Sequence, residues 1–224
     1  SPLPSPSGGE GDYSQPLQEN RERSSPHKPS PLAGEGLGEG SMTPSAPFHI
    51  RDARETDLHA IAQIHLKGWE LTYGSIITPE QMAERSVERR LPLWQRWHTD
   101  PDNLILIGGA QVERPQGFLF GGHVKDHHFI SGSCNDFDCE IYSLHCLKET
   151  QGKGLGRSLI AAAAERWQQR GHQALVLWAY RDNEYRRFYE RIGGTMVAEG
   201  IDDGVPDVAY GWKDLRQLIA RCRT

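Results

Sequence analysis

Residues 144–159 read LHCLKETQGKGLGRSL, and this stretch decides the fold. An apolar run is followed by three glycines at every second position from Gly152, and then by a helical apolar pattern. A strand that enters a helix through such a turn brings several backbone N–H groups and the positive end of the helix dipole to one point. Glycine lets an anion approach the backbone closely and accepts positive φ. The stretch therefore predicts an anion-binding turn, to which Lys153 and Arg157 add charge.

Two other phosphate-binding turns are excluded by their spacing. A P-loop requires Lys-Ser or Lys-Thr directly after its last glycine, whereas Gly156 is followed by Arg157-Ser158. A dinucleotide-binding turn requires G-x-G-x-x-G, whereas the glycines here follow G-x-G-x-G. An ordinary tight turn before a helix is the remaining alternative, and the density of glycines and cations argues against it.

The elements on both sides of this turn predict the fold class. Apolar runs predict strands at 48–54, 104–107, 117–120, 139–147, 174–180, 195–199 and 207–212. Periodicity and capping residues predict helices over 57–73, 78–97, 155–170, 184–192 and from Asp214. Strands come first in antiparallel pairs and then alternate with helices. This order predicts an α/β (α+β) domain whose mixed, mostly antiparallel sheet has about seven strands flanked by helices.

The first 47 residues differ in composition from the rest. They contain 25 Gly, Pro or Ser, including nine of the chain's 14 prolines, and almost no branched apolar residues. Such a segment buries too little surface to offset the entropy of ordering. We therefore expect residues 1–47 to be a disordered low-complexity tail and residues 48–224 to form one globular domain.

Charge and hydropathy exclude several kinds of partner. Residues 48–224 contain 22 Lys and Arg against 24 Asp and Glu, so no basic field attracts nucleic acid or an anionic membrane. No apolar stretch approaches the roughly 18–20 residues of a spanning helix, and the amino terminus lacks the pattern of a signal peptide. Four cysteines are too few for a disulfide scaffold. We expect a cytoplasmic protein with reduced thiols that binds neither nucleic acid nor membrane.

Two motifs resemble one protein family. Residues 151–156, QGKGLG, match the signature Q/R-x-x-G-x-G/A of the GCN5-related N-acetyltransferase (GNAT) superfamily. Residues 182–194, DNEYRRFYERIGG, are similar to its second signature, and a predicted strand separates the two as expected. The segment from Trp69 to Tyr73 is similar to the first-helix region of many bacterial members. The resemblance extends over most of residues 50–215.

The resemblance implies a fold, a cofactor and a reaction. The fold is the acyl-CoA N-acyltransferase fold with splayed central strands, the co-substrate is acetyl-CoA, and no metal is needed. The reaction is transfer of the acetyl group, by direct attack, to a primary amine of a small molecule or peptide. The implied cofactor-binding residues are Leu144, His145, Cys146, Gln151, Gly152, Lys153, Gly154, Leu155, Gly156, Arg157, Ser158, Asn183 and Arg187.

Candidate catalytic residues are those that could move the protons of this reaction. A base must deprotonate the amine, and a hydroxyl of pKa about 10 can protonate the departing thiolate. Tyr189 matches the tyrosine that similar enzymes aim at the coenzyme sulfur, and we predict that it is the general acid. Glu140, at the start of a predicted strand, is the predicted base, acting through a water molecule. Its rivals are Asp138, Tyr142 and His145.

Alternation along this strand predicts which side chains share a face. One face is predicted to carry Glu140, Tyr142, Leu144 and Cys146. The resemblance further implies that the backbone of Leu144 and Cys146 pairs with the pantetheine arm as an added strand.

The acceptor pocket is the part that the sequence defines least. The resemblance implies Trp69, Tyr73 and Tyr142 as substrate-binding residues, and acids and tyrosines near them suggest a cationic amine, with peptide amino termini as an equal alternative. The loop histidines His123 and His127 precede two cysteines, but this spacing is not that of a structural zinc site, so we expect no metal. These histidines either border the acceptor pocket or have no role.

Two other functions remain open at this point. A non-catalytic acyl-CoA-binding or sensing module would keep the glycine turn but would have no use for Tyr189 and Asn183. An acyltransferase for a longer acyl chain would differ only in its pocket. Similar proteins are often dimers, so a homodimer is also left open.

Overall fold

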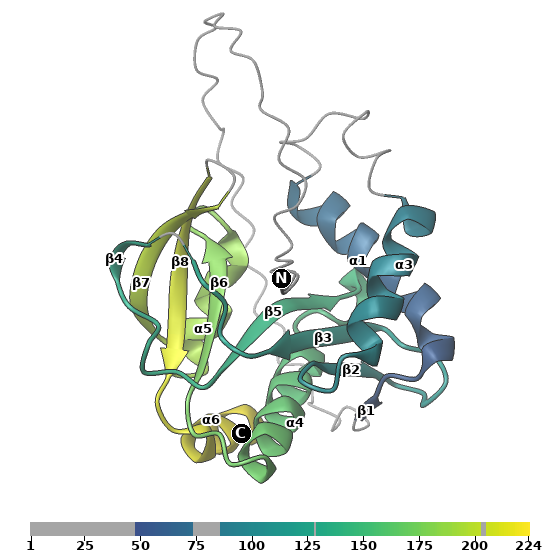
Figure 1. Ribbon diagram of the computed structural model, residues 1–224. Helices are drawn as coiled ribbons and strands as arrows, with labels where there is room; N and C mark the ends of the chain where they lie inside the picture. Colours follow the sequence, from purple (N-terminus) through teal and green to yellow (C-terminus); the bar gives the residue numbers. More distant parts are fainter. Residues whose placement is uncertain (1–47, 74–85, 128, 203–204) are drawn as a thin grey trace, which may run out of the picture. The chain divides into compact units, whose positions relative to one another are not determined.

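The computed structural model describes residues 48–73, 86–127, 129–202 and 205–224. The predicted tail at 1–47 and the predicted start of the second helix at Thr78 lie outside these residues. Elements are labelled as in Figure 1.

An eight-stranded sheet runs through the described residues in the order β1-β2-β3-β5-β6-β8-β7-β4 (Figure 1). All pairings are antiparallel except that of β5 with β6, which confirms the predicted mixed, mostly antiparallel sheet. The strands are β1 (His49–Asp52), β2 (Leu104–Gly109), β3 (Gly117–Gly122), β4 (Phe129–Gly132), β5 (Cys139–Cys146), β6 (Leu175–Tyr180), β7 (Thr195–Asp202) and β8 (Val205–Trp212).

The strand that the prediction missed is β4. Its segment is not among the predicted strands, but it pairs with β7 and forms the edge of the sheet. A strand of four residues that ends in glycine carries too short a pattern to be recognised from sequence.

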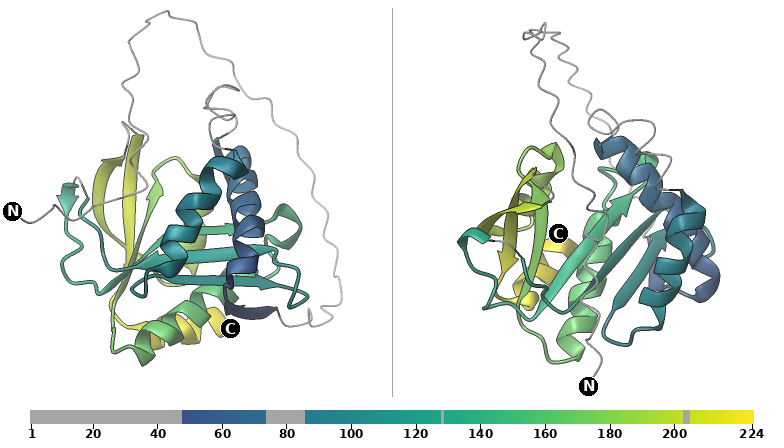
Figure 2. Two further views of the ribbon diagram at one scale, coloured as in Figure 1. Left: turned by 45° about the vertical axis from the view of Figure 1, so that its right-hand side comes forward. Right: turned by 45° about the horizontal axis from the view of Figure 1, so that its top comes forward.

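Helices cover both faces of the sheet. Helices α1 (Leu58–Tyr73) and α3 (Val87–Thr99) pack on β2 and β3 from one side, around the buried rings of Trp94, Phe118 and Phe120. The other side is packed by α4 (Leu155–Gln169) and α6 (Leu215–Arg223), and we call it the α4 face. Figure 2 shows α1 and α3 together on the side opposite α4.

The short helix α5 (Arg187–Arg191) follows β6, after a 3-10 turn at Glu184–Arg186. The predicted helix over 184–192 is therefore split into two helical turns of different type.

The two parallel strands diverge after a short common stretch. Cys139–Ile141 of β5 pair with Leu175–Leu177 of β6, and no further pairs join these strands among the described residues. Beyond this point β5 continues beside β3, and β6 continues beside β8 (Figure 1). We call this divergence the fork. Its inner edges are 142–146 of β5 and 178–180 of β6.

An irregularity in the pairing of β3 with β5 changes which side chains share a face. The register shifts between Phe120 and Gly121, opposite the middle of β5. Before the shift, Tyr142 packs with the α1 and α3 side; after it, Leu144 and Cys146 pack on the α4 face. The predicted single face for Glu140, Tyr142, Leu144 and Cys146 is therefore wrong, because strict alternation does not survive a bulge.

Gly121 should be essential to this packing. A Cβ at this position would lie 2.3 Å from the backbone oxygen of Glu140 and 2.9 Å from the Trp167 ring. We expect Gly121→Ala to destabilise the protein by about 1–3 kcal/mol, because the Glu140 backbone would have to shift to make room for the added methyl group. The melting temperature should fall by about 3–10 °C. The matched variant Gly156→Ala, whose methyl would make ordinary contacts with Phe188 at 3.5 Å and Cys146 Sγ at 4.0 Å, should melt like the wild type or higher. Equal melting of the two variants would contradict this account.

Candidate active site

The glycine turn forms the amino-terminal end of α4. Gly152 and Gly154 have φ of 72° and 96°, which favours glycine, and Gly154 is the residue before the helix. A Cβ added at either position would meet no atom within 4 Å, so the turn borders open space. Gln151 holds the turn to the end of β5 by donating from Nε2 to the carbonyl of Cys146 at 3.2 Å. The turn thus combines exposed backbone with the positive end of a 15-residue helix.

The side chains near this turn differ in their exposure to solvent and in the contacts that they already make. Lys153 is exposed, while Leu155 is fully buried in the core, so Leu155 can offer only its backbone. The Ser158 hydroxyl donates to the carbonyl of Gly154 at 3.1 Å and is therefore part of the helix start. Burial raises the pKa of the Cys222 thiol on α6, and the positive charge of Arg157 acts in the other direction. The Arg157 charge therefore lies close to α6.

On β5, the three residues predicted to contact the cofactor point to two sides. Leu144 and Cys146 pack on the α4 face. The His145 ring lies on the other side, 5.1 Å from the His65 ring, where Gly68 leaves room for it. Burial raises the pKa of the Cys146 thiol to about 12, so this residue is not a thiolate nucleophile at neutral pH.

The second motif lies close to the first. In α5, the Phe188 ring would lie 3.5 Å from a Cβ added at Gly156, and its centroid is 5.4 Å from that of Tyr189. Tyr189 is half-buried and also faces Tyr210, with ring centroids 5.9 Å apart. Asn183 accepts from the backbone N–H of Tyr185 at 2.9 Å, so its side-chain oxygen caps the turn before α5.

Arg187, also predicted to bind the cofactor, is exposed at the first position of α5. Its guanidinium is thus open to solvent near the amino-terminal end of that helix.

The most unusual polar contact of β5 joins Glu140 to His127. Glu140 is only 3% exposed, and its Oε2 accepts from the backbone N–H of Lys125 at 3.0 Å. The Nε2 atom of His127 lies 3.0 Å from Oε1 and 2.9 Å from Oε2. Because a carboxylate only accepts, Nε2 must carry the proton that it donates. The His127 ring also packs against Trp178, with centroids 4.8 Å apart.

This pair lies at the base of the fork. Glu140 belongs to the last stretch of β5 that pairs with β6, and Trp178 is the first β6 residue beyond that stretch. The sequence marked the loop histidines but contained no signal that would join His127 to Glu140, thirteen positions away.

Another buried carboxylate lies on the same side of the sheet. Asp207 of β8 is 5% exposed and stands opposite Tyr180 in the register. Burial, with the negative charge of Asp202 nearby, raises its pKa to about 6, whereas the charge of His127 acts in the other direction. Sequence analysis did not identify Asp207 or Trp178, because single residues in a strand show no motif.

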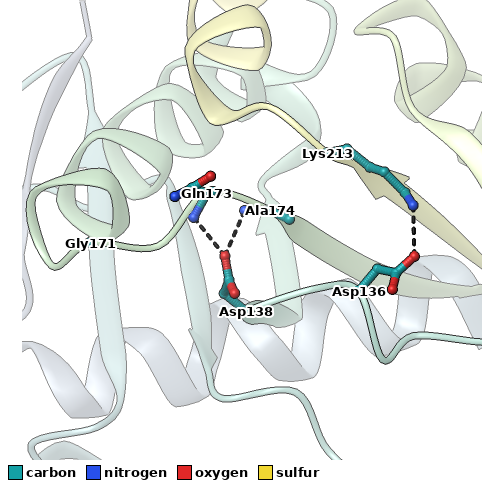
Figure 3. Close-up of a pocket in the computed structure, with 6 residues that line it drawn as sticks. All are labelled: Asp136, Asp138, Gly171, Gln173, Ala174 and Lys213. Carbon is teal, nitrogen blue, oxygen red and sulfur yellow. Dashed lines mark hydrogen bonds and ion pairs between the residues drawn. The ribbon is translucent and has the colours of Figure 1, made fainter.

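The three rival bases are engaged elsewhere. Asp138 accepts from the backbone N–H groups of Gln173 and Ala174 at 2.6 and 3.0 Å and so joins two loops at a surface pocket (Figure 3). The Tyr142 hydroxyl donates to the carbonyl of His123, and burial raises its pKa. Burial and the nearby Arg90 lower the pKa of His145 to about 4.

The predicted acceptor residues on α1 are only partly described. Trp69 donates from Nε1 to Nε2 of His65 at 2.9 Å, and the Arg90 guanidinium lies 5.4 Å from its ring centroid. Tyr73 is the last residue of α1, and its side chain lies outside the described part of the chain.

The described part of the chain contains neither a candidate metal-binding cluster nor a membrane-spanning helix. Within the described residues, no three His, Cys, Asp or Glu side chains are arranged to hold a metal ion. No helix in the ranges that the structure describes has both the length and the apolar character to cross a bilayer.

Known proteins share both the sequence pattern and the fold. Residues 123–200 match the family model described as FR47-like protein. The chain is 28% identical over 173 residues to the uncharacterized N-acetyltransferase YuaI of Bacillus subtilis (strain 168), a match that covers 75% of this chain and 95% of that protein.

Solved structures with the same fold include two that were determined with coenzyme. The PaiA N-acetyltransferase of Thermoplasma acidophilum, in complex with coenzyme A, aligns with a TM-score of 0.57 and 20% identity over 74% of this chain and 99% of that one. YncA of Salmonella typhimurium, with acetyl-CoA, aligns with a TM-score of 0.56 and 20% identity over 75% and 94%.

The forked sheet with a glycine turn at the start of α4 defines the acyl-CoA N-acyltransferase fold. The family model and the curated relative are consistent with this fold. The FR47-like match and the N-acetyltransferase relative support the resemblance to the GCN5-related N-acetyltransferase superfamily that the two sequence motifs predicted.

The buried His145 should make stability depend on pH. Its folded pKa of about 4 lies below the ordinary histidine value of 6.5, so between these values the unfolded chain binds a proton that the folded protein excludes. Stability from this group is therefore lost as pH falls from about 6.5 towards 4. Relative to His145→Asn, the wild type should lose about 2 kcal/mol between pH 7 and pH 5 in urea unfolding. The free energy of unfolding of the control His59→Asn, at an exposed position, should depend on pH as that of the wild type does. If His145→Asn shows this same dependence, His145 is not the group responsible.

Proposed function

We propose that this protein is an N-acetyltransferase that uses acetyl-CoA and acts on a primary amine by direct attack. The observation that carries the proposal is the combination of the fork with an open glycine turn on its α4 face. The curated relative named as an N-acetyltransferase and the fold neighbours solved with coenzyme support it.

The glycine turn suits the coenzyme pyrophosphate. Positive φ at Gly152 and Gly154 aims backbone N–H groups outward, and a side chain at either position would fill the space in front of them. The N–H groups of Leu155, Gly156 and Arg157 then belong to the first turn of α4, where a helix leaves such donors unpaired. Lys153 would add a charge-assisted contact from its exposed position.

The fork suits the pantetheine arm. An unpaired inner strand edge is a template for an extended ligand with alternating donors and acceptors. On β5 this edge runs from residue 142 to Cys146, and Leu144 and Cys146 fix it by packing on the α4 face. Asn183 keeps its amide N–H₂ for a ligand, because its own turn uses only the oxygen.

The proposed chemistry needs one proton removed and one supplied. When bound, acetyl-CoA supplies a thioester carbonyl whose departing sulfur must be protonated. Tyr189 is the proposed general acid, since α5 lies against Gly156 and a phenol keeps its proton at neutral pH. Glu140, where the fork begins, is the proposed general base. The raised pKa of Cys146 supports direct attack without an acylated cysteine.

The Gly154→Glu variant should lose coenzyme binding, because the new carboxylate would fill the turn and repel the pyrophosphate. Titration calorimetry with acetyl-CoA and with CoA measures this. The matched control is Gly171→Glu, since Gly171 has φ of 93° and open space as well but lies at the other end of α4. We expect the affinity for acetyl-CoA and CoA to fall at least about 100-fold in Gly154→Glu and to stay unchanged in Gly171→Glu. Equal binding by the two variants would remove the turn from the proposed site.

Replacement of Tyr189 by Phe should reduce turnover and leave coenzyme binding intact. The volume and the contact with Phe188 stay the same, and only the hydroxyl is lost. Loss of a general acid lowers kcat by about 100-fold or more. The exposed Tyr185→Phe serves as the control with unchanged kcat. Wild-type turnover in Tyr189→Phe would exclude it as the acid.

A further inference from the structure

His65 lies in a buried cluster of aromatic rings between α1, α3 and β5. It is 1% exposed, and the ring centroids that lie 5.1–6.3 Å from its own are those of Trp69, Trp94, Phe118 and His145. Burial lowers the pKa of His65 well below its ordinary value, and two neighbouring basic side chains act in the same direction. The His65 imidazole is therefore neutral at physiological pH.

Two of the described side chains direct a hydrogen-bond donor at this ring, one at each nitrogen. The Trp69 indole donates from Nε1 to Nε2 of His65 at 2.9 Å. A terminal guanidinium nitrogen of Arg90, a residue that is 4% exposed, lies 3.2 Å from Nδ1 of His65. An indole nitrogen and a guanidinium can only donate hydrogen bonds. Both contacts therefore require His65 to be the acceptor.

A neutral imidazole cannot accept at both nitrogens. One nitrogen carries a hydrogen and the other a lone pair, so only one of the two donors can be bonded at a time. When the hydrogen is on Nδ1, Nε2 accepts from Trp69, and the N–H groups of His65 and Arg90 oppose each other. When the hydrogen is on Nε2, Nδ1 accepts from Arg90, and the opposed N–H groups are those of His65 and Trp69. We call these arrangements the indole state and the guanidinium state.

Neither state has a clear energetic advantage. The bond from Arg90 has an ionised donor, and charge-assisted hydrogen bonds are stronger than neutral ones. The bond from Trp69 is shorter, and 3.2 Å, the distance from Arg90, is at the long end of the range for N–H donors. These two differences favour opposite states. The free energies of the two states are therefore close enough for both to be populated.

Trp69 is the donor that can move. The Arg90 guanidinium is buried and lies 5.4 Å from the centroid of the Trp69 ring. Trp69 is half-buried, and a side chain that reaches the surface changes rotamer more readily than one in a close-packed interior. In the guanidinium state, the opposed N–H groups therefore push the indole away from Nε2 of His65.

The cluster lies beside the open edge of β5. His145 belongs to that edge, at 142–146, and its ring centroid is 5.1 Å from that of His65. Gly68, the residue before Trp69, packs so closely on the His145 ring that a Cβ at Gly68 would collide with it. A movement of Trp69 therefore changes the surface of α1 next to the fork.

We propose that His65 is a tautomeric switch that accepts a hydrogen bond from either Trp69 or Arg90, and that Trp69 exchanges between two positions beside the fork. In each exchange one ring N–H bond of His65 breaks and the other forms, with the proton passed through water during local opening, so the net charge does not change. The switch requires neither coenzyme nor acetyl transfer. Its tests are therefore independent of the proposed function.

The ring nitrogens of His65 report the two states directly. In the 15N-labelled full chain at about pH 8, where ordinary histidines are neutral, the chemical shift separates a protonated from an unprotonated ring nitrogen. We expect signals from both tautomers of His65, averaged or separate, with at least about a tenth of the molecules in the minor state. The internal control is His98, whose Nε2 lies 3.1 Å from the carbonyl of Ala53 and should show the Nε2–H tautomer alone. A single tautomer of His65 would overturn the proposal.

Two variants should shift the tautomers of His65 in opposite directions. Trp69→Phe removes the indole donor, so the Nε2–H tautomer of the guanidinium state should remain. Arg90→Gln introduces an amide oxygen that can accept from Nδ1–H, so the indole state should remain. The matched control is Trp97→Phe, whose indole packs on Trp94, and it should keep the wild-type ratio. Should the buried Arg90→Gln fail to fold, Trp69→Phe decides: an unchanged ratio in that variant would overturn the proposal.

The Trp69 indole should show the same exchange. Its Nε1–H resonance should show relaxation dispersion if the exchange occurs in μs–ms, or two signals if it is slower. The Trp212 indole donates from Nε1 to the carbonyl of Ile192 at 3.0 Å, so its resonance is the control that should show neither. In Arg90→Gln the exchange contribution at Trp69 should fall at least about tenfold, because one state is lost. A Trp69 resonance as static as that of Trp212 in the wild type would overturn the proposal.

Discussion

The structure depends on the parting of two parallel strands after three paired residues. Both strands keep their outer partners to the end, β5 with β3 and β6 with β8, so each backbone is half satisfied wherever the fork is open. Inner strand edges of this kind are normally covered, because unpaired N–H and C=O groups invite another strand. Here α4 packs across the fork on one face, and α5 brings Phe188 against Gly156. The fold thus holds open an edge that is the right shape for an extended ligand.

The bulge between β3 and β5 gives the fork two chemically different sides. Without the register shift, Glu140 would share a face with Leu144 and Cys146, and one side of β5 would have to be both charged and packed against α4. With the shift, Leu144 and Cys146 pack against α4, and the Glu140 carboxylate contacts His127. Gly121 makes this possible, since any side chain there would collide with the Glu140 carbonyl.

Sequence reasoning succeeded where the physics is local. The positive φ of residues 152 and 154 favours glycine, and these glycines predicted the turn. The strands of the core followed from apolar runs that turned out to be fully buried, such as β2 and β3. The bulge, the edge strand β4 and the contact of His127 with Glu140 were out of reach, because each depends on two segments meeting in space. Asp207 was missed for the same reason: its burial, not its identity, makes it unusual.

The sheet also separates positively charged groups from negatively charged ones. The glycine turn and Lys153 favour a polyanion at the end of α4, whereas Glu140 and Asp207 lie on the side of the sheet away from the α4 face. Had both sets shared one cavity, the cations would have paired with the carboxylates. Distance and the intervening apolar layer reduce this mutual neutralisation, since charges pair most strongly at contact. On that side, Asp207 is a costly group for the fold, because its Oδ1 atom is buried and has no hydrogen-bond partner among the described residues.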